Sequence, residues 1–69
     1  MDASEIDNIF KYHSPKEDQP QRYEGLRSVG RQLAFLIEDS CPDSREKSVA
    51  ITKVQEAIMW ANASIAINE

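Results

Sequence analysis

The chain has 69 residues, a formal net charge of −4, one cysteine and one histidine. A chain this small is marginal as an independent core and usually needs disulfides, a metal or oligomerisation. The lone cysteine excludes an internal disulfide, and one His with one Cys does not make a four-ligand metal site, so the composition indicates a homo-oligomer.

The composition also excludes several classes of function. No apolar run approaches the roughly 20 residues that span a bilayer and no signal peptide is visible, which predicts a cytoplasmic protein without membrane contact. The acidic balance argues against a DNA- or RNA-binding protein, although it allows a small anionic ligand in a local basic pocket. Cys41 fits a reducing compartment and is expected to be a small buried hydrophobe near a helix end.

The first elements in chain order are a short helix and a loop. A helix of about two turns is predicted over residues 2–10, with Ser4 as its N-cap. A helix of this length is too short to be stable alone. Its apolar side consists of Ile6, Ile9 and Phe10. Residues 11–21 carry two prolines, and Pro20 suits the first turn of the helix that follows.

The second helix is predicted over residues 20–39. Its apolar positions step by three and four: Tyr23, Leu26, Gly30, Leu33 and Ile37. Gly30 costs roughly 1 kcal/mol of helix propensity relative to Ala, and a close approach of another backbone would explain it.

The third helix is predicted from about residue 43 to residue 66. Asp43 and Ser44 are both good N-cap residues, and Asp43 with Glu46 has the spacing of a capping box. One apolar seam of this helix is formed by Ile51, Val54, Ile58, Ala61 and Ile65. The short linker at residues 40–43 predicts an antiparallel hairpin of the two long helices. The fold class is therefore all-α, with residues 1–69 as a single helical hairpin domain.

Apolar residues also occur outside the two seams. Met59 and Trp60 fall on another face of the third helix, and a two-helix hairpin has only one shared interface. Chains are therefore expected to pack on chains, with Trp60 as an anchor of the oligomer core. Asn62 is expected to hydrogen-bond between helices.

Three groups of residues could bind an anionic ligand. Lys11, Tyr12 and His13 combine basic groups and an aromatic ring in the loop, and Arg27 and Arg31 follow one turn apart on the next helix. Ser44 and Arg45 open the third helix, where free N–H groups favour an anion. Composition and spacing alone favour a simpler interpretation, in which the tyrosine covers the hairpin edge, the arginines balance acids and the serine is a cap. No catalytic or metal-binding set is visible, so no enzyme and no cofactor is expected.

Four sequence stretches carry a resemblance to a known family. They are KYHSP at 11–15, QPQRYE at 19–24, CPDSRE at 41–46 and EAIMWANASIA at 56–66. With these stretches the chain resembles, over residues 9–68, the phage cyclic-nucleotide sponges of the anti-CBASS and anti-Thoeris hairpin family. The most specific part is the run from Met59 to Ala63.

The resemblance implies a helical hairpin assembled as a hexamer that sequesters cyclic oligonucleotides, chiefly cyclic dinucleotides, without cleaving them. A loop tyrosine and a basic residue fifteen positions later line the family's dinucleotide pocket, and the matching positions are Tyr12 and Arg27. Many relatives that bind cyclic trinucleotides carry a basic residue near position 67, where this chain has Ile67, which argues against that second site. The longer members that act on ADP-ribose-derived signals carry extra sequence, so that activity is not expected here. The alternatives are a helical adaptor for a host protein and, more remotely, a nucleotide-processing enzyme.

Overall fold

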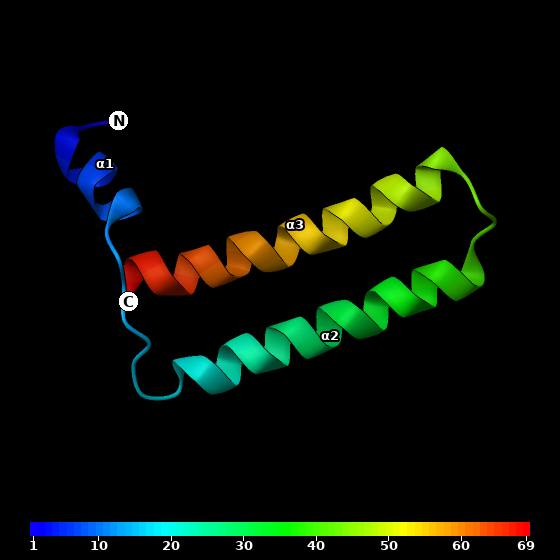
Figure 1. Cartoon of the computed structure of the whole chain (residues 1–69), viewed down its shortest axis with the longest axis horizontal. Helices are drawn as coiled ribbons and strands as arrows, with labels where there is room; N and C mark the ends of the chain where they lie inside the picture. Colours follow the sequence, from blue (N-terminus) through cyan, green and yellow to red (C-terminus); the bar gives the residue numbers. More distant parts are fainter.

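The computed structural model describes all 69 residues and contains three helices and no strand. Helix α1 spans Ala3–Phe10, α2 spans Gln19–Ser40 and α3 spans Arg45–Asn68. The two long helices run antiparallel side by side, and α1 stands off beside the C-terminal end of α3 (Figure 1). The predicted all-α hairpin is confirmed, with helix boundaries shifted by one or two residues.

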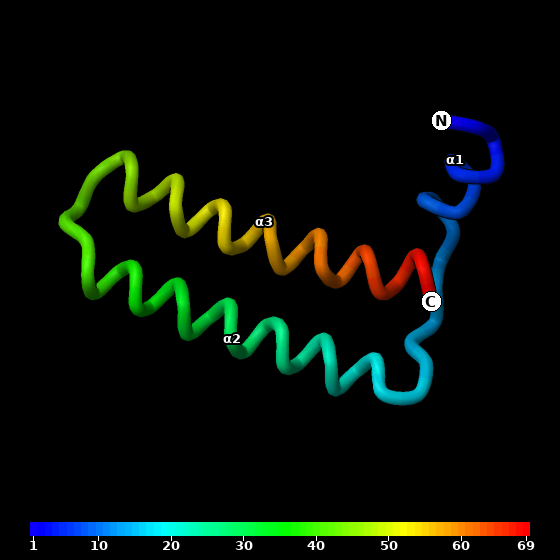
Figure 2. The backbone as a smooth tube through the Cα atoms, turned by 180° about the vertical axis from the view of Figure 1, so that it is seen from behind, coloured from blue at the N-terminus to red at the C-terminus, as the bar shows by residue number.

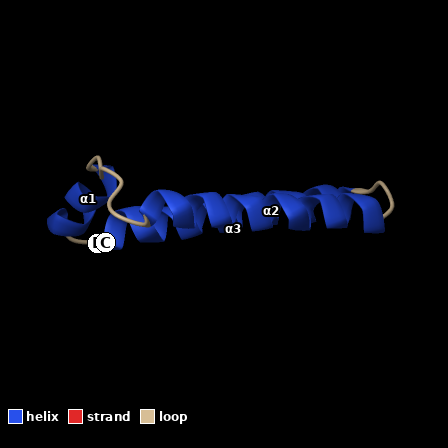
Figure 3. Cartoon of the chain, turned by 90° about the horizontal axis from the view of Figure 1, so that it is seen from below, coloured by secondary structure: helices blue, strands red, loops and turns tan.

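The molecule is a flat slab rather than a globule. Its extents are 45 × 29 × 12 Å, and the short dimension equals the diameter of about one α-helix. The chain path seen from behind is an open loop in which α2 and α3 lie in one plane (Figure 2), and the edge-on view shows a single helical layer (Figure 3). Both broad faces of the hairpin are consequently open to solvent.

The cap predicted for α1 is wrong, and the cap of α3 is Ser44, the second of its two predicted candidates. Asp2, not Ser4, caps α1, because its carboxylate accepts from the Glu5 N–H at 2.8 Å and an ionised oxygen suits a helix N-terminus. Ser44 caps α3 by accepting from the Lys47 N–H at 3.1 Å. The backbone of Ser44 is extended (φ −167°, ψ 164°), so the helix starts one residue later than a box from Asp43 would require.

The hairpin turn is closed by Lys47, whose side chain is only 7% exposed. Its ammonium lies 3.2 Å from Glu38 on α2 and also pairs with Asp43 in the turn. The hydrogen bond from Lys47 lowers the pKa of Asp43, and the reciprocal bond raises the pKa of Lys47 despite its desolvation. Cys41 in the same turn is exposed, so its predicted burial is wrong, because the turn bends away from the seam.

The seam between α2 and α3 is closest at Gly30, which is buried. A Cβ built there would lie 2.6 Å from Cγ1 of Ile58, so the close approach inferred from the sequence is confirmed. Leu33, predicted in the seam, is 44% exposed, and the half-buried Ala34 takes its place. At 3.6 residues per turn, Ala34 falls about 40° from Gly30 and Leu33 about 60°, and the small side chain suits the narrow gap.

No apolar side chain of the chain is fully buried. The seam is half-buried, and large apolar side chains face solvent, as predicted for Met59 and Trp60. None of the three helices combines the length and apolar character that crossing a bilayer requires. The hairpin therefore exposes more apolar surface than one seam can cover.

Candidate ligand-binding site

The seven residues predicted to bind a ligand lie in three separate regions of one chain. Lys11, Tyr12 and His13 follow α1, Arg27 and Arg31 lie on α2, and Ser44 and Arg45 lie at the turn. The turn is separated from the Tyr12 loop by the length of α2, about 33 Å for its 22 residues. Arg27 lies in the half of α2 that is nearer to the Tyr12 loop, whereas Arg31 lies just past the middle of that helix. The loop itself follows α1, beside the C-terminal end of α3 (Figure 1).

The loop after α1 presents an unpacked aromatic ring. Tyr12 is 80% exposed, and it borders a cavity of about 270 Å³ together with Lys11, His13 and other loop residues. Ala66 and Glu69 of the α3 end line the same cavity. A free ring beside an ammonium group can stack on a base while the cation pairs with a phosphate.

One of the two ring nitrogens of His13 is already used in a hydrogen bond within the chain, so it is not free to contact a ligand. Its Nε2 donates to the carbonyl oxygen of Asn8 at 2.9 Å, which fixes the proton on that nitrogen because a carbonyl only accepts. Asn8 in turn donates from Nδ2 to the carbonyl oxygen of Ile67 at 3.1 Å. His13 therefore links the loop to α1, and Asn8 links α1 to α3.

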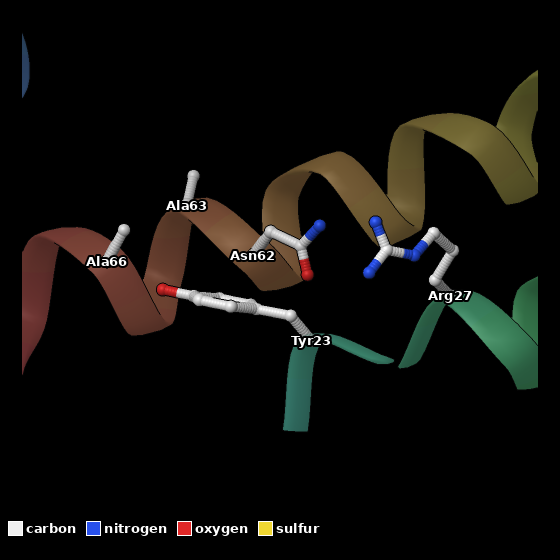
Figure 4. A pocket seen from close by; sticks show the side chains of 5 residues that line it. All are labelled: Tyr23, Arg27, Asn62, Ala63 and Ala66. Atoms are coloured by element: carbon white, nitrogen blue, oxygen red, sulfur yellow. The ribbon is translucent and has the colours of Figure 1, made fainter. Parts of the chain in front are cut away.

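Arg27 borders a second hollow between the long helices. This groove of about 400 Å³ is lined by Tyr23, Arg27, Asn62, Ala63 and Ala66 (Figure 4). Arg27 and Asn62 point toward one another across it, and the ring of Tyr23 lies along α3. The predicted interhelix hydrogen bond of Asn62 is absent, because its buried Oδ1 has no partner.

The Arg27 guanidinium is weakly held. Its side chain is 67% exposed, and its ion pair is with Glu24 at 3.5 Å on the same helix. Exposed pairs of this kind contribute little, so Arg27 can turn to an anion at small cost. Arg31 lies over the ring of Phe35, with 4.8 Å between the guanidinium carbon and the ring centroid.

At the turn, Ser44 is occupied by structural bonds. Its hydroxyl accepts from the Lys47 N–H and donates to the carbonyl oxygen of Pro42 at 3.1 Å. Arg45 is exposed beside it, far from the Tyr12 loop. These two residues fit the simpler interpretation as a helix cap and a solvated cation.

Tyr12 and Arg27 border different cavities, which share Ala66 as a lining residue. One chain thus brings the ring and the guanidinium to the same half of the hairpin without enclosing a ligand between them. The groups present are a free aromatic ring, mobile cations and an unpaired amide oxygen. These are groups that bind bases and phosphates rather than a nucleophile held by a base.

A cluster of polar side chains around Glu69 was not predicted from any sequence pattern. Its carboxylate accepts from both guanidinium nitrogens of Arg22, at 2.8 Å for Nη1 to Oε2, and from Nε2 of Gln19 at 3.3 Å. The Arg22 hydrogen bond is the main cause that lowers the pKa of Glu69 to about 2, and the same bond raises the pKa of Arg22. Gln19 and Glu69 are 50 residues apart, a separation at which spacing rules for one helix carry no signal.

Comparison with known protein families gives one match. The family model described as Acb2/Tad1, hairpin domain, matches residues 1–66 of the chain. No curated protein and no solved structure matches. The match covers all three helices almost to the end of α3, and it agrees with the hairpin architecture and with the sequence resemblance. The chain therefore belongs to the Acb2/Tad1 hairpin-domain family of phage anti-defence sponges.

Proposed function

We propose that the protein binds and sequesters cyclic oligonucleotide messengers, chiefly cyclic dinucleotides, and thereby blocks CBASS-type signalling. The observation that carries the proposal is the family match over residues 1–66. The proposed place of action is the cytoplasm of the infected cell, where such messengers are made and sensed.

The proposed contacts are a base stacked on Tyr12 and a phosphate paired with Arg27. Tyr12 is exposed in the loop, and Arg27 is exposed and weakly paired on α2, so each is free to contact a ligand. Lys11 beside the ring adds a second cation. Base–aromatic stacking contributes about 1–3 kcal/mol per base, and a guanidinium matches the phosphate fork.

We propose further that the pocket is completed by a second chain in a homo-oligomer, which we expect to be a hexamer. A cyclic dinucleotide has two bases and two phosphates in a nearly two-fold arrangement. A two-fold interface supplies each residue twice, so one ring and one cation per chain give two of each. The apolar side chains that a single hairpin leaves in water support such an assembly.

The proposed mechanism is reversible binding of the messenger, without any chemical reaction of the ligand. A stable oligomer in excess of its messenger lowers the free concentration below the level that the effector needs. Position 67 offers an Ile side chain and no cation, so we propose a preference for dinucleotides over trinucleotides.

Calorimetric titration against a panel of cyclic di- and trinucleotides tests the function. Bound ligand should be recovered chemically unchanged after hours with Mg²⁺ or Mn²⁺, and its activator function should return when the protein is denatured. Linear products that accumulate with protein concentration would reject sequestration and favour an enzyme. No binding to any cyclic nucleotide, together with a stable complex with a host protein, would favour the helical adaptor.

A further inference from the structure

Tyr12 is 80% exposed, so little packing around the side chain holds its ring in place. Its position is set by the backbone of the loop that carries it. That loop is fastened at two points, one on each side of Ser14 and Pro15. The groups that hold these two points therefore limit where the backbone places the ring of Tyr12.

The first point is His13, which is fastened to α1 through the carbonyl of Asn8. Asn8 is fastened in turn to the carbonyl of Ile67. The second point is Lys16, whose backbone N–H donates to Oε1 of Gln19 at 3.0 Å. Because Oε1 of Gln19 accepts from the loop, its Nε2 is the atom left to donate to Glu69.

Both sets of hydrogen bonds end at the C-terminal end of α3, one on Ile67 and the other on Glu69, the C-cap of that helix. The carboxylate of Glu69 accepts hydrogen bonds from Gln19 and Arg22. Its main-chain oxygen accepts from Nζ of Lys16 at 3.1 Å. Gln19 is only 4% exposed, so its two hydrogen bonds are made away from competing water. The carboxylate therefore holds the N-terminal end of α2 and, through Gln19, the backbone of the Tyr12 loop.

The loop adopts a backbone conformation that needs such support. Glu17 has φ of 41°, in the left-handed region that residues with a Cβ rarely occupy. Strain of this kind persists only where the surrounding contacts over-determine the backbone. The bonds at Lys16 and Gln19, on either side of Glu17 and Asp18, supply those contacts, including the Gln19 N–H to the Lys16 carbonyl at 2.8 Å.

We propose that Glu69 is a positioning residue for ligand binding: its carboxylate, relayed by the Gln19 amide, holds the loop so that Tyr12 is pre-set to stack on a base. The inference rests on the proposed function, since it concerns the same Tyr12. A loop that is already ordered loses less conformational entropy when the ligand binds. Glu69 itself need not touch the ligand.

The test uses the full chain in its native assembly and the isosteric substitution Glu69→Gln. The new amide presents an NH₂ group to donors from Arg22 and Gln19, so the relay loses an acceptor. Gln19→Ala is the second variant, because it removes the relay and leaves the Arg22–Glu69 ion pair. Glu38→Gln is the matched control, since it weakens an α2–α3 ion pair with Lys47 at the opposite end of the hairpin.

Two measurements are made on each variant. Hydrogen–deuterium exchange without ligand should be faster over residues 11–18 in Glu69→Gln and Gln19→Ala, and unchanged there in Glu38→Gln. Titration with cyclic di-GMP and cyclic GMP–AMP should show about 3- to 10-fold weaker binding in the first two variants only, the scale of one lost hydrogen bond. Oligomer mass by light scattering should stay the same.

A double-mutant cycle separates positioning from general stability. In a Tyr12→Ala background, Glu69→Gln should weaken binding by less than twofold, because no ring remains to be positioned. Equal weakening in both backgrounds, or unchanged loop exchange in Glu69→Gln, would overturn the positioning role. If Tyr12→Ala alone binds the cyclic dinucleotides as tightly as the parent does, the proposed contact of the ligand with Tyr12 is wrong. If Tyr12→Ala weakens binding but Glu69→Gln does not, only the positioning role of Glu69 is wrong.

Discussion

The guanidinium groups of Arg22 and Arg27 lie on the same helix but are held very differently. Arg22 is clamped by Glu69 and lies 3.2 Å from Asp18, whereas Arg27 has only Glu24 at 3.5 Å. A guanidinium group that already donates hydrogen bonds to carboxylates has few donors left for a phosphate. A weakly paired guanidinium can exchange its carboxylate for a phosphate at small cost in free energy. We therefore expect Arg22 to stabilise the fold through its ion pairs and Arg27 to be available for a ligand.

The first prediction concerns these free groups. Tyr12→Ala and Arg27→Ala should each weaken cyclic-dinucleotide binding at least tenfold, because a two-fold pocket loses both copies and one stacked ring contributes about 1–3 kcal/mol. Calorimetry measures the affinity, and light scattering should give the parent oligomer mass. Arg45→Ala, at the turn, is the control and should bind normally. Parent affinity in both site variants would reject the two contacts.

The second prediction concerns acid. The pKa of Glu69 is lowered from the ordinary value of 4.5 to about 2, chiefly by the Arg22 hydrogen bond. Since the folded-state pKa lies below the unfolded one, the stabilisation is complete above pH 4.5, declines as the pH falls, and is lost through pH 2. The difference in melting temperature between the parent and Glu69→Gln should shrink over that window. An NMR titration of the Glu69 carboxyl with a midpoint near 4.5 would contradict the clamp.

At the scale of helices, most of the architecture could be predicted from the sequence. Two long antiparallel helices follow from apolar residues at three- and four-residue steps, from Pro20 in the first turn of α2 and from a short linker. The differences are local: Ala34 rather than Leu33 lies in the seam, and Asp2 rather than Ser4 caps α1. Of the two predicted caps of α3, Ser44 is the one that forms, so the capping box from Asp43 does not. Those details depend on how closely two helices approach, which a pattern in one helix does not encode.

The site was less predictable than the helices. Residue type and spacing place Tyr12 and Arg27 among several candidates for an anionic ligand but favour a simpler structural interpretation. The family resemblance is what selects these two from the other basic and aromatic residues. The Glu69 cluster had no signal at all, because it joins segments 47 to 53 residues apart. Contacts of that range are fixed by the hairpin and loop together, and no local rule of sequence spacing describes them.

The third prediction compares the two glycines of α2. Gly25 has nothing within 4 Å of a built Cβ, so Gly25→Ala should stabilise the protein by about 0.5–1 kcal/mol through helix propensity. Gly30→Ala gains the same propensity but places its Cβ 2.6 Å from Ile58 Cγ1, and relieving that overlap costs typically about 1–3 kcal/mol. Chemical denaturation should show a gain at Gly25 and none at Gly30. Equal gains at both positions would show that the helices are not in close contact at Gly30.

At the scale of the whole molecule, the hairpin is one helix thick and has no fully buried apolar side chain. Folding is stabilised mainly by removing apolar surface from water, and a single layer removes little of it. We therefore expect association with other copies to contribute to the stability of the fold. The same association would bring a second Tyr12 and a second Arg27 near the first pair, which links stability to the proposed binding site.

The last prediction concerns that assembly and centres on Trp60, whose side chain is 74% exposed in the single chain. Burying an indole contributes about 2–4 kcal/mol per copy, so an interface that covers it should weaken strongly when it is replaced by a charge. Light scattering at micromolar concentration should give the mass of a hexamer for the parent and a smaller species, or loss of helical signal, for Trp60→Glu. Ser48→Glu inserts the same carboxylate at an exposed position of α3 that lies about 120° around the helix from Trp60, and it should keep the parent mass. A parent protein that is a folded, stable monomer at that concentration would contradict the assembly, because the exposed apolar faces would then be tolerated in water without a partner.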